Sequence, residues 1–320
     1  MELNYNQICE LRRTLDGNNR FLMLLDKSPD GDQLGASYAM GMWLRSRGKQ
    51  VSWRCLEVIP QNYWLTNFPE EVNDEIKEAQ EYDVVIINDC GNLKRTGLLE
   101  AKPGFLENSF IINFDHHPSN TLFGNINIID TQAAATCEIM YFILKEFGVT
   151  LDPDMATYLL LGLYADTGCF QHTNTSKQNL AIASSLIQRG ANMLKAAKAV
   201  RTIPLLALAK WGKILEEVKI HDGVCAIFVT KELIEKYDIA KDELSGMSEI
   251  LVTVPGVKFS MVITELQDEL KGSLRTERND IDVMKICQDF GGGGHKKAAG
   301  FIFSKDDEQL KEKLFGLLGV

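Results

Sequence analysis

The chain has 320 residues, which is long for one hydrophobic core and predicts two domains. Its 45% hydrophobic and 24% charged residues are typical of a folded globular protein. The formal net charge of -10 excludes a broad basic surface for long nucleic acid, but not a small phosphorylated substrate. No apolar run is as long as a membrane span, and the seven dispersed cysteines contain no CxxC pair. We therefore expect a cytoplasmic protein with reduced thiols and no membrane association.

The first half of the chain alternates apolar runs with helical patterns. Residues 4–16 predict an amphipathic helix. Strands are predicted at Arg20–Leu25, Val51–Cys55, Asp83–Asn88, Ser109–Phe114 and Asn125–Asp130. Helices are predicted before Gly48, over Ala133–Phe147, and from Asp152 to Tyr164. This alternation predicts an α/β fold with a doubly wound, largely parallel sheet.

Acids and imidazoles follow the predicted strands and one of the helices. These residues are Asp26, Asp30, Asp32, Asp89, Asp115, His116, His117 and Asp166. Taken singly, several have an ordinary structural explanation, such as a Pro-Asp-Gly turn, an N-capping Asp or a helix that stops before glycine. However, the carboxyl ends of parallel strands meet at one edge of a sheet. Their convergence there favours one metal-binding site over independent turns.

The second half begins with helices and then changes to strand patterns. Consecutive helices are predicted at Leu180–Arg189, Met193–Arg201 and Leu205–Lys219. Strands follow at Val224–Thr230, Val257–Glu265 and Lys271–Thr276, with a helix at Ile281–Phe290. We therefore expect a first domain over 1–190, a helical connector over 191–220, and a smaller α/β domain over 221–320.

Near the C-terminus, four glycines precede His295 and two lysines. Successive glycines expose backbone N–H groups, and cationic side chains beside them suit phosphate oxygens. The alternative is a flexible linker. Because an apolar strand pattern begins at once with Ala298, we favour an anion-binding loop.

Taken together, these motifs resemble the DHH phosphoesterase superfamily, in the branch of nanoRNases and pAp phosphatases with a DHH-associated C-terminal domain. The matching segments are Pro29–Asp32, Asp89, Asp115–His117, Asp166–Gly168, Ser273–Thr276 and Gly291–Gly300. They occur in the family's order between about residues 20 and 304.

The resemblance implies two divalent metal ions, with Mn²⁺ expected and Mg²⁺ as the alternative. One ion would be held by Asp26, Asp30 and Asp89. The other would be held by Asp32, Asp89, His116 and Asp166, so that Asp89 bridges the two. At the position of Asp26 the family usually has a histidine. A carboxylate also suits these metals, so we expect a retained site with altered metal preference.

The resemblance also implies roles for the remaining residues. His117 would face the phosphate and act in catalysis together with Asp89. The substrate would be bound by Arg275, Gly292, Gly293, Gly294 and His295.

The implied reaction is hydrolysis of short 5′-phosphorylated oligonucleotides, such as pApA-like dinucleotides, and of pAp. Two ions would activate a water for in-line attack on phosphorus. Long duplex nucleic acid is not an expected partner, and a homodimer is allowed. Two alternatives stay open: an exopolyphosphatase or pyrophosphatase, and a nucleotide-binding sensor that lost turnover through the change at Asp26.

Overall fold

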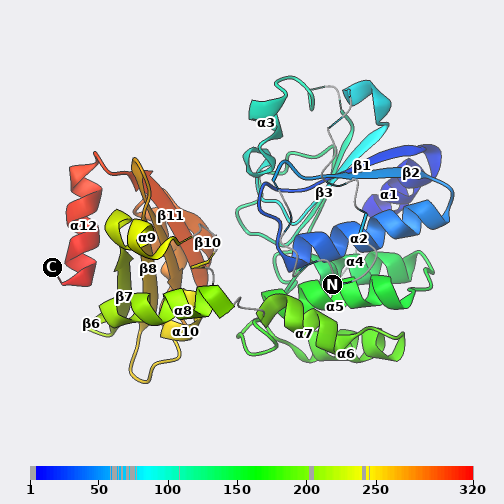
Figure 1. Cartoon of the computed structure of the whole chain (residues 1–320). Helices are drawn as coiled ribbons and strands as arrows, with labels where there is room; N and C mark the ends of the chain where they lie inside the picture. Colours follow the sequence, from blue (N-terminus) through cyan, green and yellow to red (C-terminus); the bar gives the residue numbers. More distant parts are fainter. Residues whose placement is uncertain are drawn as a thin grey trace. The chain divides into compact units, whose positions relative to one another are not determined.

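The computed structural model describes residues 5–57, 59, 63, 65, 68, 69, 72, 76, 78–107, 109–201, 205–239, 243, 244 and 246–319. The chain forms two compact units, Met1–Thr202 and Ile203–Val320 (Figure 1). The division between them lies inside the segment 191–220, the predicted connector. In the part of the chain that is described, no helix is both long and apolar enough to cross a membrane.

A five-stranded sheet forms the centre of the first unit. Its strands are β1 (Arg20–Leu24), β2 (Gln50–Arg54), β3 (Val84–Asn88), β4 (Ile111–Asp115) and β5 (Ile126–Ile129). They lie in the order β2-β1-β3-β4-β5, and every neighbouring pair is parallel. The predicted doubly wound parallel sheet is confirmed. The strand order reverses between β1 and β3, which is the place where open α/β sheets bind ligands.

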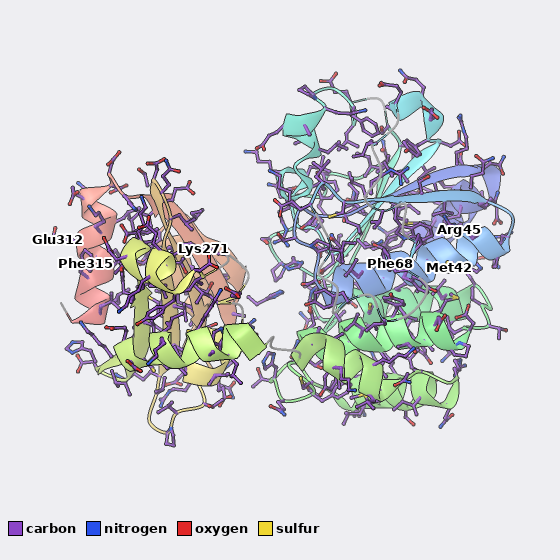
Figure 2. All side chains as sticks on the ribbon, viewed as in Figure 1. Met42, Arg45, Phe68, Lys271, Glu312 and Phe315 are labelled. Atoms are coloured by element: carbon purple, nitrogen blue, oxygen red, sulfur yellow. The ribbon has the colours of Figure 1, made fainter. Side chains whose placement is uncertain are left out.

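Helices cover one face of this sheet, where the larger hydrophobic core lies. The helices that supply this core include α1 (Tyr5–Gly17), α2 (Gly31–Ser46), α4 (Thr136–Glu146) and α5 (Pro153–Asp166), as Figure 1 shows. Two further helices, α6 (Lys177–Gln188) and α7 (Met193–Arg201), pack against α5. Phe68 belongs to this core, with its ring centroid 5.8 Å from Tyr38 and 5.6 Å from Tyr158 (Figure 2).

Short elements cover the other face. They are η3 (Ala79–Glu81), η4 (Leu93–Thr96) and α3 (Leu98–Ala101). Successive side chains of a strand point to opposite faces, so Phe21 and Met23 join the helical core while Leu22 and Leu24 join a smaller cluster under these elements. Burial on both faces explains why the strands read as continuous apolar runs.

The second unit contains a six-stranded mixed sheet in the order β10-β11-β9-β8-β7-β6. Its strands are β6 (Lys219–His221), β7 (Val224–Val229), β8 (Phe259–Glu265), β9 (Glu269–Arg275), β10 (Gly293–His295) and β11 (Ala298–Ser304). Its helices are α8 (Leu205–Ile214), η5 (Leu215–Glu217), α9 (Lys231–Tyr237), α10 (Met247–Leu251), α11 (Val283–Gln288) and α12 (Glu308–Leu318). Separate apolar clusters on the two faces make this a second core.

One predicted helix is shorter than expected. The pattern predicts a helix over Leu205–Lys219, whereas α8 ends at Ile214 and β6 begins at Lys219. Strand β6 pairs with β7 through a tight turn in which Asp222 and Gly223 have φ values of 47° and 82°. Such an Asp-Gly pair is typical of a two-residue hairpin turn. Of the predicted helix, Leu215–Glu217 forms η5 and only Lys219 is paired in the hairpin.

Candidate metal centre

Two of the predicted acids, Asp26 and Asp30, lie in the loop between β1 and α2. Asp26 directly follows the strand region and is only 3% exposed. Its backbone N–H donates to Gln33 Oε1 at 2.8 Å, and Gln33 Nε2 donates to the Asn88 carbonyl at 2.7 Å. The buried Gln33 amide thus ties the end of β1 to the end of β3. Asp30 caps α2, because its Oδ1 accepts from the backbone N–H groups of Asp32 and Gln33 at 3.0 and 3.1 Å.

The third acid, Asp32, lies in the first turn of α2 and is fully buried. Its oxygens accept from the backbone N–H groups of Thr136 at 2.5 Å and Cys137 at 2.8 Å. These groups belong to the start of α4, where Ala135 offers no side-chain cap. Burial, together with the charges of Asp166 and Asp89, raises the pKa of Asp32 well above its usual range. A cation would relieve this crowding of negative charge.

Asp89 follows β3 in a left-handed conformation, with φ of 52°. Non-glycine residues seldom adopt this conformation, and such strain gathers at functional sites. Its Oδ1 accepts from the Thr136 hydroxyl at 3.1 Å and lies 3.4 Å from His116 Nε2. Burial opposes its charge, but the hydrogen bond to His116 and the charges of both histidines lower the pKa of Asp89 below its usual range.

The end of β4 supplies Asp115, His116 and His117. Asp115 is fully buried, and its Oδ1 lies 2.7 Å from His117 Nδ1, while Asn120 donates to its Oδ2 at 2.6 Å. Asp115 thus orients His117. His116 Nδ1 lies 3.2 Å from the Ala133 carbonyl, which points Nε2 towards the acids. Burial favours a neutral imidazole, but hydrogen bonds and charges from Asp166 and Asp89 outweigh it and raise the pKa of His116 well above its usual range.

Asp166 is the last residue of α5, and its Oδ2 lies 3.1 Å from His116 Nε2. Two glycines allow α2 and α5 to approach closely enough for this. A Cβ at Gly162 would lie 2.6 Å from Asp32 Oδ1, and one at Gly35 would lie 2.3 Å from the Tyr158 carbonyl oxygen. Since real Cβ atoms do not come this near, the helix contact depends on both glycines.

The structure gathers most of the ligand set expected for one metal ion. Asp32, Asp89 and His116 can each offer a ligand atom within 4.8 Å of the others, and Asp166 contacts His116. Carboxylate and imidazole ligands suit Mn²⁺ or Mg²⁺. The other set is less complete, because Asp26 and Asp30 belong to no three-residue group of this kind in the described ranges. Yet Asp26 Oδ1 is buried without a hydrogen-bond partner among the described residues, which fits a metal ligand.

Three contacts in this centre were not predicted from the sequence. Arg95 Nε donates to Asp26 Oδ2 at 2.5 Å. Gln33 Oε1 accepts from the Asp26 N–H, and the Thr136 hydroxyl donates to Asp89 Oδ1. Arg95 follows Lys94 in a polar turn, and no pattern distinguishes the two cations. Thr136, the first residue of α4, was detectable only as a residue in the first turn of the helix predicted over Ala133–Phe147.

The predicted substrate residues lie in the second unit. Gly293, Gly294 and His295 form β10, which pairs antiparallel with β11, so this part of the glycine run is a strand and not an open loop. Arg275 ends β9 and forms an ion pair with Glu249 at 2.7 Å. A shallow hollow of about 320 Å³ lies on this unit, lined by Lys271, Gly272, Ser273, Gly291, Gly292, Gly300, Phe301 and Ile302. Phosphate binding by the predicted substrate residues, which are Arg275, Gly292, Gly293, Gly294 and His295, stays a prediction.

A parallel sheet with acids and imidazole at its carboxyl edge defines an α/β protein with a candidate metal centre. The family model of the DHH family, N-terminal domain, matches residues 20–163, and that of the DHHA1 domain matches residues 221–315. The chain therefore belongs to the DHH family and carries a DHHA1 domain.

Curated relatives match most of the chain. A bifunctional oligoribonuclease and PAP phosphatase NrnA of Thermus thermophilus is 27% identical over 92% of this chain and 86% of its own length. A protein of the same description from Bacillus subtilis is 24% identical over 93% of this chain and 94% of its own length. With the family, these relatives identify the chain as a hydrolase that acts on phosphoester bonds.

A solved structure shares the fold. It is the crystal structure of an exopolyphosphatase-related protein from Bacteroides fragilis, with a TM-score of 0.86 and 23% sequence identity. The match covers 98% of this chain and 96% of the other.

Proposed function

We propose that the chain is a manganese-dependent phosphoesterase that hydrolyses short 5′-phosphorylated oligonucleotides and pAp. The observation that carries the proposal is the buried meeting of Asp32, Asp89 and His116, with Asp166 in contact with His116. Four separate elements supply these side chains, so ordinary turn formation does not account for their convergence. The substrate class is supported by the relatives from Thermus thermophilus and Bacillus subtilis, each described as a bifunctional oligoribonuclease and PAP phosphatase.

The proposed centre holds two ions. Asp32, Asp89, His116 and Asp166 would hold one, while Asp26, Asp30 and Asp89 would hold the other. Bound divalent ions would supply an activated water and neutralise the charge of the phosphate. Hydrogen bonds from the start of α4 fix Asp32 and Asp89, so the ligands would be ordered before a metal arrives.

His117 would act on the phosphate and not as a metal ligand. The Nδ1 atom of His117 is occupied by its contact with the Asp115 carboxylate. Because this carboxylate is buried, the pair stays together. Burial disfavours the charged imidazole, but the hydrogen bond to Asp115 and the charges of Asp89 and Asp115 raise the pKa of His117 above its usual range. An imidazole held in this way can donate a hydrogen bond to a phosphate oxygen.

In the second unit, Arg275, His295 and the glycines Gly292, Gly293 and Gly294 would bind a distal phosphate of the substrate. Guanidinium and backbone N–H groups are suitable donors to phosphate oxygens. Binding of the distal phosphate by these residues would favour substrates of a few nucleotides. The acidic chain gives longer strands little further attraction.

A substrate panel tests the proposal. The metal-stripped protein is given Mn²⁺ and then pAp, pApA, 5-mer RNA, 24-mer RNA, cyclic di-AMP or pyrophosphate. We expect the highest kcat/KM for pApA or pAp and a steep loss towards the 24-mer. Preference for pyrophosphate would favour a phosphoanhydride hydrolase, and Mn²⁺-dependent nucleotide binding without turnover would identify a sensor. Either outcome would overturn the proposed activity.

A further inference from the structure

The contact between Asp26 and Arg95 places a positively charged side chain of the protein beside the candidate metal centre. Arg95 Nε donates to Asp26 Oδ2 at 2.5 Å, and the Asp26 side chain is only 4% exposed. The Arg95 side chain is 54% exposed, so the pair lies at the solvent-facing border of the acid cluster. A carboxylate paired with a guanidinium carries no net charge.

The position of Arg95 is fixed by its backbone. The Arg95 carbonyl accepts from the Lys27 N–H at 3.1 Å, which joins the η4 turn to the loop that carries Asp26. Asn92 caps this turn by accepting from the Lys94 N–H at 3.0 Å. Gly97 closes it with φ of 70°, and a Cβ there would lie 2.0 Å from the Lys27 side chain. The turn is therefore docked against the Asp26 loop, which brings the Arg95 side chain within reach of Asp26.

The two oxygens of Asp26 have different surroundings. Oδ2 receives the Arg95 hydrogen bond, whereas Oδ1 is buried and has no hydrogen-bond partner among the described residues. A buried carboxylate oxygen without a donor is costly, and a metal ion is one of the groups that can complete it. Asp26 can thus bind Arg95 and a metal at once, through different oxygens.

The charges of the proposed ligands support the same arrangement. The carboxylates assigned to the two ions are Asp26, Asp30, Asp32, Asp89 and Asp166. Their five negative charges exceed the four positive charges of two divalent cations by one, and Arg95 supplies the missing positive charge.

We propose that Asp26 and Arg95 work as one neutral ligand unit: Asp26 gives Oδ1 to a divalent ion, while Arg95 holds Oδ2 and cancels the added carboxylate charge. Arg95 is then a positioning residue that allows a carboxylate to stand where a neutral ligand would otherwise be required. The inference rests on the proposed metal-dependent function, but it concerns metal binding and not turnover.

Removal of both charges of the pair, in turn and together, tests this inference. Full-length wild type, D26H, D26H/R95Q and D26H/K94Q are stripped of metal, and Mn²⁺ binding is followed by isothermal titration calorimetry. D26H leaves Arg95 without its carboxylate, so we expect Mn²⁺ binding at one of the two sites to weaken by at least about tenfold. D26H/R95Q removes the excess charge and should return this affinity close to that of wild type.

Lys94 provides the matched control, because it is an exposed cation in the same turn. D26H/K94Q should stay as weak as D26H. Circular dichroism checks folding, and the nearly isosteric series D26N, D26N/R95Q and D26N/K94Q gives the same comparison if D26H does not fold. The inference is overturned if D26H binds Mn²⁺ as tightly as wild type, or if R95Q does not restore the affinity lost in D26H. It is also overturned if K94Q restores that affinity as well as R95Q does. A wild-type chain that binds no Mn²⁺ would instead refute the proposed function.

Discussion

At the scale of single residues, the centre brings together side chains whose charges conflict when no metal is bound. Asp32 is fully buried beside Asp89 and Asp166, and its pKa is raised by that burial and by their charges. Burial opposes a charge on His116, but the carboxylates of Asp166 and Asp89, 3.1 and 3.4 Å from its Nε2, outweigh burial and raise its pKa. In the metal-free chain, protons on these groups therefore neutralise part of the negative charge that a bound cation would neutralise.

This conflict predicts how the stability of the metal-free chain depends on pH. A group whose pKa is raised in the folded state contributes stability that is complete below its unfolded pKa and lost as pH rises through the folded value. The unfolded pKa is about 3.9 for Asp32 and about 6.5 for His116. Asp32 therefore makes the metal-free chain less stable as pH rises above about 3.9, and His116 does so as pH rises above about 6.5.

Thermal unfolding in EDTA and in Mn²⁺ measures this effect. Metal binding displaces protons and strengthens as pH rises, so the increase in Tm caused by Mn²⁺ should be larger at pH 8.5 than at pH 6.5. Asp166→Asn, which removes one acid from the cluster, should reduce the difference. An increase in Tm that does not vary with pH would contradict this description of the centre.

At the scale of elements, the close contact of α2 with α5 positions Asp32 and Asp166. Gly162→Ala would place a Cβ 2.4 Å from Cys137 Sγ and 2.6 Å from Asp32 Oδ1. We expect overpacking to lower the free energy of unfolding by about 1–3 kcal/mol. The displaced helix should also weaken Mn²⁺ binding.

A second helical glycine gives the matched control. Gly212 lies within α8, and a Cβ there would have no described heavy atom within 4 Å. Gly212→Ala should therefore stabilise the chain by about 0.5–1 kcal/mol, because alanine suits a helix better than glycine. Denaturant unfolding of both variants makes the comparison. An equal effect of the two substitutions would show that helix propensity matters here, and not the space between α2 and α5.

The elements also show how far the sequence could predict the structure. Continuous apolar runs revealed the buried strands, and the acids after β1 and β3 could be assigned to one edge because parallel strands share a direction. The contact of Arg95 with Asp26 was not predictable, since it depends on how the η4 turn packs against the neighbouring loop. The predicted helix ran on to Lys219 because its pattern did not reveal that the hairpin at Asp222 and Gly223 pairs this residue in β6.

At the scale of the whole molecule, the proposal divides the work between two units with separate cores. If the second unit binds the distal phosphate, its binding energy orients the scissile phosphate at the metal centre. Arg275→Ala and His295→Ala should each lower kcat/KM for pApA by at least about tenfold, the loss expected when a charged hydrogen bond to substrate is removed.

Two controls make this prediction specific. Hydrolysis of bis-p-nitrophenyl phosphate needs only the metal centre and should change little in either variant. Arg278→Ala removes an exposed arginine of the same unit that pairs with Asp280 at 2.7 Å, and it should behave as wild type. Equal losses on both substrates would instead assign Arg275 and His295 to the fold or to the metal centre.

The central claim is that a metal held by Asp89 and its neighbours hydrolyses phosphoester bonds. Asp89→Asn is the sharpest variant, because asparagine tolerates the left-handed backbone that Asp89 adopts at φ of 52°. The measurement is the rate of pApA hydrolysis by metal-stripped wild type and Asp89→Asn, each titrated with Mn²⁺. We predict that Mn²⁺ restores turnover in wild type and that the variant, shown to be folded by circular dichroism, keeps at most about 1% of it. Wild-type hydrolysis without any divalent metal, or near-normal turnover by Asp89→Asn, would contradict the claim.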